Sequence, residues 1–409
     1  MEISNIIIEK RPRLQCANFF ITFTENFVQQ DAVKLNVSAD KLVIRFDDRE
    51  FLVKLSDHLQ LHTKTLSQLI IKKNYVSFRI NTNMENFTSE VLEVHPTTNA
   101  NNNSYLLESG LTLNTPYKVH CSNCTNILTP DEVIFGRILE LPSENMDMSE
   151  WFCHKHGTCG ASEAVSDTNN DESRFYDESI EDKFNSNKFK PGTKDIFYGN
   201  YFGLFNMKLF KNVRIKGKLV YCRRCFQFLG ELTNLKYKDA IKVWNDTVNF
   251  EKIPSGDTIF LFDNTSLLKN FIFILCKLQH DFTFELFGLP QLFKVIFEAT
   301  LSDGKKNFLL LQVMDHNLEM LRLQKPAEND EIQASLLLEK CKTMKLLFKF
   351  EEDEEQPLVK FWLSNTNVSS VQISPQMFTA AVEYLTKMSS LIPECYRTSY
   401  GFVLSYLDM

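Results

Sequence analysis

The chain has 409 residues and a formal net charge of -7, and this length predicts two or three packed domains rather than one small module. Hydrophobic residues make up 44% and charged residues 24%, which is ordinary globular usage and excludes a fibrous or wholly disordered chain. The longest apolar run, at 271–276, is far shorter than the roughly 20 residues that cross a bilayer, and the start of the chain carries Glu2 and Glu9 instead of basic residues. The acidic balance disfavours a protein that neutralises phosphates. We therefore expect neither a membrane nor a nucleic acid as a direct partner.

The first part of the chain, residues 1–115, alternates apolar and polar residues in short runs. These runs cover 19–23, 41–46, 51–55 and 76–80, with a hairpin turn at 47–49. A period of two is typical of half-buried strands. We predict a β-sandwich-like N-terminal domain over 1–115.

The last part of the chain, residues 233–409, predicts an α+β domain. Its expected strands are 258–262, 282–287, 294–299, 307–313, 345–350, 358–363 and a closing strand from 402. One helix is expected over 332–344. A second helix begins with Ser374 as N-cap and Pro375 at its first position, and its apolar residues share one face. The fold class predicted for the whole chain is α+β and β-rich.

The middle part, residues 116–232, carries two Cys-x-x-Cys turns. Disulfides are disfavoured for ten cysteines in a chain that we expect to remain inside the cell, because the cytosol and nucleus keep thiols reduced. Two such turns at hairpin tips are typical of a tetrahedral zinc site, whose ligands would be Cys121, Cys124, Cys222 and Cys225. Four thiolates leave no position for water, so the predicted zinc is structural. The alternatives are a redox dithiol and unpaired buried cysteines.

A second cluster lies between the turns, at Trp151-Phe152-Cys153-His154. Neighbouring residues in an extended segment point to opposite sides, so Cys153 and His154 suit two metals better than one. Either they contribute to a second structural zinc or replace a ligand of the first site, or they are offered to a partner's metal with Trp151 and Phe152 as an apolar anchor. The acidic stretch at 161–193 follows, and we predict a disordered loop inserted in the zinc module.

Several short segments of the sequence, taken together, resemble one known family. They are the segment 141–145 (Leu-Pro-Ser-Glu-Asn), the Trp151 to His154 cluster, the second Cys-x-x-Cys turn with Leu-Gly-Glu at 229–231, and the terminus 392–409. This combination resembles the ubiquitin-protein ligases described as HECT-like ubiquitin-conjugating-enzyme-binding proteins. The resemblance implies that the chain binds a ubiquitin-conjugating enzyme and directs ubiquitin to protein substrates. It also implies cyclin B binding, a nuclear and cytoplasmic location, and association with the metallo-β-lactamase-fold endonuclease of pre-mRNA cleavage and polyadenylation.

A ligase of the HECT type needs an exposed thiolate that accepts and passes on a thioester. Apart from the metal candidates, the cysteines considered are Cys16, Cys276, Cys341 and Cys395. Cys395 lies near the C-terminus, roughly where a HECT nucleophile would be, and is the candidate catalytic residue. Its context lacks the Thr-Cys-Phe pattern of HECT enzymes, which leaves open whether the chain is an enzyme.

The alternative function is that of a binding protein. The segment from Leu-Pro-Ser-Glu to Trp-x-Cys-His is also similar to the tail of the assembly partner of the Integrator endonuclease. That resemblance implies a non-catalytic chaperone or inhibitor of the polyadenylation endonuclease, which inserts residues 151–154 into the two-metal site. Cys153 and His154 would then occupy metal positions normally taken by water and phosphate.

Overall fold

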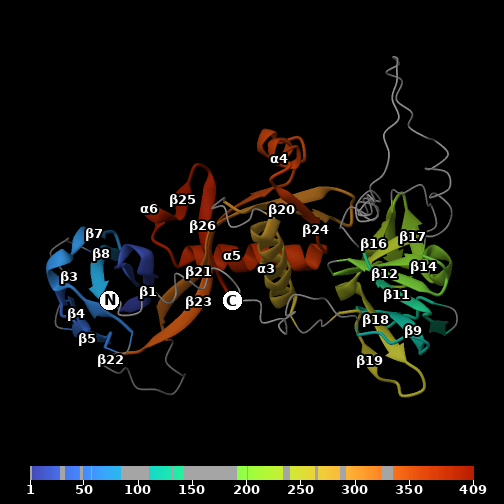
Figure 1. Ribbon diagram of the computed structural model, residues 1–409, viewed down its shortest axis with the longest axis horizontal. Coiled ribbons are helices and arrows are strands. Elements are labelled where there is room, and N and C mark those ends of the chain that lie inside the picture. Colours follow the sequence, from blue (N-terminus) through green and yellow to red (C-terminus); the bar gives the residue numbers. More distant parts are fainter. Residues whose placement is uncertain are drawn as a thin grey trace, which may run out of the picture.

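The protein is described by a computed structural model in which strands predominate (Figure 1). The described residues are 2–27, 33–46, 49–56, 58–83, 110–129, 132–141, 191–199, 201–233, 240–262, 266–285, 292–324 and 335–409. Within these ranges no helix combines the length and the apolar character that crossing a membrane requires. The architecture is α+β and β-rich, as predicted.

The largest sheet passes through the middle of the molecule and contains eleven of the described strands. Eight follow the order β25-β26-β23-β21-β1-β2-β8-β6, while β20 pairs with β21 and β24, and β7 pairs with β8. The strand bounds are β1 (Ile3–Arg11), β2 (Cys16–Phe23), β6 (Gln60–Leu61), β7 (Ser67–Lys72), β8 (Tyr75–Asn83), β20 (Lys294–Thr300), β21 (Lys306–Leu323), β23 (Leu338–Glu351), β24 (Ser369–Gln372), β25 (Thr398–Ser399) and β26 (Phe402–Asp408). Strands from the first and last parts of the chain therefore share one sheet. The domain boundaries at 115 and 232 stay a prediction.

A smaller sheet covers the N-terminal strands of the largest sheet (Figure 1). Its strands are β3 (Val33–Val37), β4 (Lys41–Phe46), β5 (Arg49–Lys54) and β22 (Ser335–Leu336). Inward residues such as Phe19 and Ile21 on β2 and Ile44 on β4 are fully buried in a shared core, because alternate side chains of each strand point to the same face. Phe46 pairs with Arg49 across the predicted hairpin, whose turn residues 47–48 lie outside the described ranges.

Two further sheets form the end of the molecule opposite β3 to β5 (Figure 1). The seven-stranded sheet contains β11 (Arg137–Glu140), β12 (Asp195–Gly199), β13 (Phe202–Asn206), β17 (Ala240–Trp244), β16 (Phe228–Leu232), β15 (Leu219–Cys222) and β14 (Val213–Lys216) in that order. The four-stranded sheet contains β10 (Val133–Ile134), β9 (Pro116–Cys121), β18 (Val248–Lys252) and β19 (Thr258–Ile259). Their core continues into that of the central sheet and includes residues of two helices, α3 (Leu267–Glu285) and α5 (Pro375–Ser390).

The helix α5 begins as predicted. The Ser374 hydroxyl accepts the backbone N–H of Met377 at 3.1 Å, and Pro375 takes the first helical position. Phe378, Leu385 and Met388 are buried on its inner face. The predicted closing strand is also present as β26, which pairs with β23.

Three predicted elements are wrong. The expected helix over 332–344 falls largely on β23, because pairing of β23 with β21 over residues 338–351 outweighs the helix-like spacing of its apolar residues. The expected strand 282–287 begins inside the last turn of α3. This helix starts beside Ser266, whose hydroxyl accepts the backbone N–H of Lys269 at 3.4 Å. The expected strand 358–363 is the helix α4 (Pro357–Leu363), whose start is marked by Pro357.

A group of charged and polar side chains, called here the buried ion cluster, joins both ends of the chain at the central sheet. Glu9 on β1 is fully buried and accepts bonds from Lys345 and Tyr406, each at 2.5 Å, and from Arg11 at 2.9 Å and Asn18 at 3.2 Å. Burial raises the pKa of Glu9, but the charges of Lys345 and Arg11 outweigh it and hold the pKa at about 2. The buried carboxylate is therefore ionised and fully partnered.

Candidate functional site

Four cysteine sulfurs converge at one point between the seven-stranded and four-stranded sheets. The Sγ atoms of Cys121, Cys124, Cys222 and Cys225 all lie within 4.8 Å of one another. The Cys121–Cys225 and Cys124–Cys222 Sγ···Sγ distances are both 3.7 Å. Sulfurs about 2.3 Å from a tetrahedral ion would be separated by about 3.8 Å. The donor set therefore fits a tetrahedral metal ion, and these four residues are called the cysteine cluster below.

The two Cys-x-x-Cys turns have the same backbone geometry. The N–H of the first cysteine bonds a carbonyl five residues later, from Cys121 to Asn126 and from Cys222 to Gln227, each at 2.9 Å. The residue after the second cysteine adopts positive φ, 58° at Thr125 and 61° at Phe226. Its N–H returns to the carbonyl of the first cysteine at 2.9 Å and 3.0 Å. Each turn therefore presents its pair of sulfurs in the same way.

Backbone amides also point at the sulfurs. Cys121 accepts from the amides of Asn123 and Cys124, and Cys225 accepts from the amide of Gln227. Burial raises the pKa of Cys121 to about 12 and also raises the pKa of Cys124. At Cys225 burial acts in the same direction, but the Gln227 amide and neighbouring side chains outweigh it and lower the pKa to about 7. Amide donors favour the thiolate over the thiol, and the thiolate is the form that binds a metal.

Two polar side chains connect the turns across the cluster. The Asn126 side-chain amide, beside the first turn, lies 3.7 Å from the sulfur of Cys222 in the second turn. The guanidinium of Arg224 donates to the carbonyl of Cys124 at 3.4 Å. Arg224 thus joins the two turns, and its positive charge lies near the thiolates and offsets part of theirs.

The first turn is also tied to the start of α5. The Ser122 hydroxyl donates to the backbone carbonyl of Asp246 at 2.9 Å, and the Ser374 hydroxyl donates to the Asp246 carboxylate at 2.6 Å. Burial raises the pKa of Asp246 to about 6. No sequence motif marks Asp246, because its importance comes from packing between β17 and β18 rather than from local spacing. The N-cap pattern at Ser374 was visible in the sequence, but its partner was not.

The predicted partner-metal segment lies outside the described ranges. This holds for Trp151, Phe152, Cys153 and His154, and for residues 161–190 of the predicted acidic loop. The assignment of Cys153 and His154 to a second zinc or to a partner's metal therefore stays a prediction.

Cys395 lies far from the cysteine cluster, on the short helix α6 (Glu394–Arg397). It is exposed, and its Sγ lies 2.8 Å from the hydroxyl of Tyr75 on β8. Glu394 pairs with Lys73, and the Tyr396 hydroxyl bonds Ser77 at 3.0 Å, so α6 is held against β8 and the turn that precedes it. Tyr75 was not anticipated, since more than 300 residues separate the two partners along the chain.

The other described cysteines outside the cluster are less accessible. Cys16 is 1% exposed in β2. Burial raises the pKa of Cys276 to about 11 and also raises that of Cys341. Cys341 lies on β23 beside the guanidinium of Arg322 at 3.1 Å, not on the helix surface expected from the sequence. Cys395 is thus the exposed thiol of the described ranges.

Comparison with protein families gives a match over nearly the whole chain. The model of the family described as HECT-like ubiquitin-conjugating enzyme (E2)-binding covers residues 9–402. This range includes the cysteine cluster, Cys395 and strands of every described sheet. Comparisons with curated proteins and with solved structures found no match. On the strength of the family match, the chain belongs to the HECT-like ubiquitin-conjugating enzyme (E2)-binding family.

Proposed function

We propose that this protein binds a ubiquitin-conjugating enzyme and directs ubiquitin to protein substrates. The observation that carries the proposal is the family match over residues 9–402. The family description names conjugating-enzyme binding, and transfer of ubiquitin is the further step of the proposal.

Zinc is the proposed metal of the cysteine cluster. Four thiolates at tetrahedral separation favour zinc over hard cations, which prefer oxygen ligands. A bound zinc would supply structural stability only, because its four protein ligands leave no site for water or substrate. Zinc bound by Cys121 and Cys124 on one side and by Cys222 and Cys225 on the other would hold the four-stranded and seven-stranded sheets together.

Cys395 is the proposed acceptor of ubiquitin. Its exposure would allow a thioester to form, and the Tyr75 hydroxyl at 2.8 Å could donate a hydrogen bond to a thiolate. In the step, the Cys395 sulfur attacks the carbonyl of the thioester on the conjugating enzyme. A new thioester forms on Cys395, the enzyme's cysteine leaves as thiolate, and the proton of Cys395 passes to it or to water.

The test is single-turnover incubation with a conjugating enzyme that carries ubiquitin as a thioester. We expect an adduct that reducing agent cleaves, and we expect Cys395→Ala to abolish it while the matched variant Cys276→Ala retains it. Binding without an adduct would remove transfer from the proposal and leave conjugating-enzyme binding. Lack of binding to every member of a panel of conjugating enzymes would contradict the proposed function.

The remaining implications of the resemblance stay predictions. They are cyclin B binding, the nuclear and cytoplasmic location, and the alternative role as a chaperone or inhibitor of the polyadenylation endonuclease. That alternative depends on residues 151–154, which lie outside the described ranges.

A further inference from the structure

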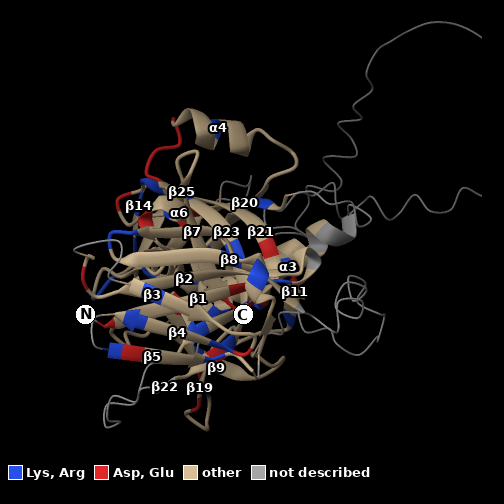
Figure 2. Ribbon diagram, turned by 90° about the vertical axis from the view of Figure 1, so that its left-hand side faces the viewer, with Lys and Arg blue, Asp and Glu red and all other residues tan. Residues whose placement is uncertain are grey.

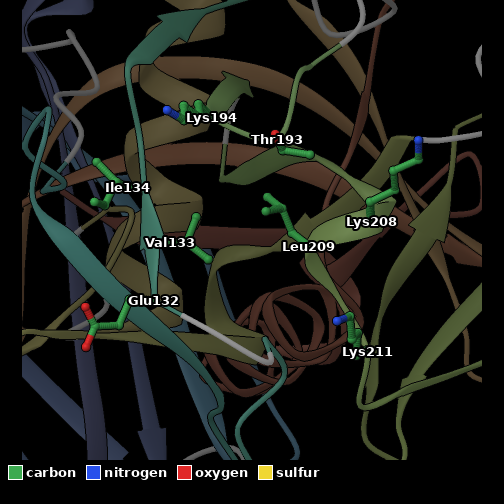
Figure 3. A pocket seen from close by; sticks show the side chains of 8 residues that line it. All are labelled: Glu132, Val133, Ile134, Thr193, Lys194, Lys208, Leu209 and Lys211. Carbon is green, nitrogen blue, oxygen red and sulfur yellow. The ribbon is translucent and has the colours of Figure 1, made fainter.

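A pocket with an apolar centre and a basic rim opens between β10, the residues just before β12 and the residues just after β13 (Figure 3). Its volume is about 360 Å³. Val133 on β10 and Leu209 face each other across its centre, and Ile134 beside them is 45% exposed. Around this apolar centre lie the side chains of three lysines and one acidic residue, namely Lys194, Lys208, Lys211 and Glu132.

Two of these lysines, Lys208 and Lys211, are the first basic residues of a strongly basic part of the sequence. Residues 208–224 contain seven basic residues and no acidic one, in a chain whose net charge is -7. They are Lys208, Lys211, Arg214, Lys216, Lys218, Arg223 and Arg224. None of the seven has an ion-pair partner within the described ranges. Within the part of the chain that the structure describes, no ion pair therefore neutralises their positive charge.

The pocket is structurally continuous with the second Cys-x-x-Cys turn. The N–H of Lys211 donates to the carbonyl of Leu128, and the carbonyl of Asn212 accepts the N–H of Arg223, both at 3.0 Å. Beyond this turn, the Arg214 guanidinium lies 5.6 Å from the ring centroid of Phe226. We call the surface from the pocket to Phe226 the basic face.

We propose that the basic face binds an acidic peptide segment of a partner protein, with an apolar side chain of that segment seated in the pocket between Val133 and Leu209. Charge complementarity favours carboxylates near the three rim lysines. Ile134, which is exposed, and Leu209, which is half-buried, give such a segment an apolar anchor.

An RNA strand fits the same face less well. Phosphates would pair with the lysines, but the centre of the pocket is lined by aliphatic side chains, whereas single-stranded nucleic acids bind through aromatic stacking platforms. Phe226 is exposed, yet one of its faces is covered by Arg214. This inference goes beyond the proposed function and does not require that the protein transfer ubiquitin.

The test is fluorescence anisotropy of the full metal-loaded chain with a labelled peptide in which a leucine-phenylalanine pair is flanked by glutamates. The double variant Lys208→Glu with Lys211→Glu should weaken binding by at least about tenfold, because it reverses two charges at the rim. The Lys208 amide donates to the Asn206 side chain and the Lys211 amide to the Leu128 carbonyl, so the substitutions keep these backbone hydrogen bonds. Ile134→Ser should weaken binding by about threefold through loss of apolar contact.

A matched control reverses the same number of charges at the opposite end of the molecule. Lys54→Glu with Lys64→Glu changes exposed residues of β5 and of the short 3-10 helix Thr63–Thr65. Figure 2 shows β5 on the side of the molecule that faces the viewer. Equal weakening by the control and by the Lys208 and Lys211 variant would overturn the proposal, since it would reflect net charge alone. Tighter binding of a labelled oligouridine than of the peptide would also overturn it, in favour of RNA. Retained affinity for a peptide with glutamines in place of glutamates would overturn the proposal too, because binding would then not depend on the acidic charge.

Discussion

The cysteine cluster and the buried ion cluster solve the same problem with different chemistry. Each fastens together segments that are far apart in the sequence: residues 121–124 to 222–225 in one case, and β1 to β23 and β26 in the other. The first uses four sulfurs that one metal ion can hold. The second uses a buried carboxylate with an amine, a guanidinium and a phenol around it.

The difference between the two clusters shows which long-range contacts can be predicted from local sequence patterns. A metal site needs two ligands in one turn, so each half of the cysteine cluster is a local pattern that can be recognised alone. Glu9 has no such pattern, because its partners Lys345 and Tyr406 reach it only when β1 and β23 stand in the central sheet. The two regions should therefore respond very differently to substitution.

The largest effect is expected from loss of one cysteine ligand. Cys222→Ser should release the metal and unfold the sheets around the cluster, because structural zinc contributes roughly 10 to 16 kcal/mol, comparable to or above the roughly 5 to 15 kcal/mol stability of a domain. Metal content by mass spectrometry and thermal unfolding check this. Cys395→Ser makes the same chemical change at an exposed cysteine and should keep the metal. A soluble, metal-free Cys222→Ser protein with unchanged melting would show that a metal at the cluster does not stabilise the surrounding sheets.

A smaller but still large effect is expected in the buried ion cluster. Glu9→Gln removes the charge of the buried carboxylate that pairs with the largely buried Lys345, and removal of one member of a buried pair costs about 3 to 5 kcal/mol. Urea unfolding at neutral pH measures the loss. The matched control is Glu50→Gln on β5, whose partner Arg45 lies 2.7 Å away but where both side chains are more than half exposed. That variant should cost no more than about 1 kcal/mol. Equal losses in the two variants would contradict the role given to burial.

The pH dependence of the Glu9 contribution has a defined sign. The pKa of Glu9 in the folded protein is about 2, below its ordinary value of 4.5. A lowered carboxyl pKa stabilises the folded state above the unfolded-state pKa, and this stabilisation is lost as the pH falls towards the folded-state pKa. The difference in unfolding free energy between the wild type and Glu9→Gln should therefore be full at pH 7 and shrink as the pH falls from about 4.5 towards 2. A difference that grows on acidification would contradict the ionised state of Glu9.

Local patterns in the sequence predicted what is local in the structure. The four cysteine ligands, the N-cap of α5 and the strands β2, β4, β5 and β8 could be predicted because their signals lie within a few residues. The prediction over 332–344 failed because the neighbouring strand β21 decides the conformation of that segment. The Tyr75 partner of Cys395 and the Asp246 link to Ser374 had no local signal at all.

The smallest effect tests whether the turns of the cysteine cluster carry backbone strain. Thr125 adopts φ of 58°, a region that costs a residue with a Cβ roughly 1 to 2 kcal/mol and costs glycine little. Thr125→Gly should therefore raise the unfolding free energy of the metal-bound protein by up to about 1 kcal/mol, part of the gain being offset by the greater freedom of glycine in the unfolded chain.

The matched control makes the same substitution where φ is not positive. Thr63 is exposed and begins a short 3-10 helix on the N-terminal side of the molecule, and Thr63→Gly should lower stability by about 0.5 to 1 kcal/mol. Thermal unfolding of both variants with metal in excess gives the comparison. If Thr125→Gly destabilises as much as Thr63→Gly, the positive φ is not a source of strain. The turn would then depend on the contacts of the Thr125 side chain, such as its bond to the Cys124 carbonyl at 2.7 Å, and the geometry shared with Phe226 would not reflect a common backbone requirement.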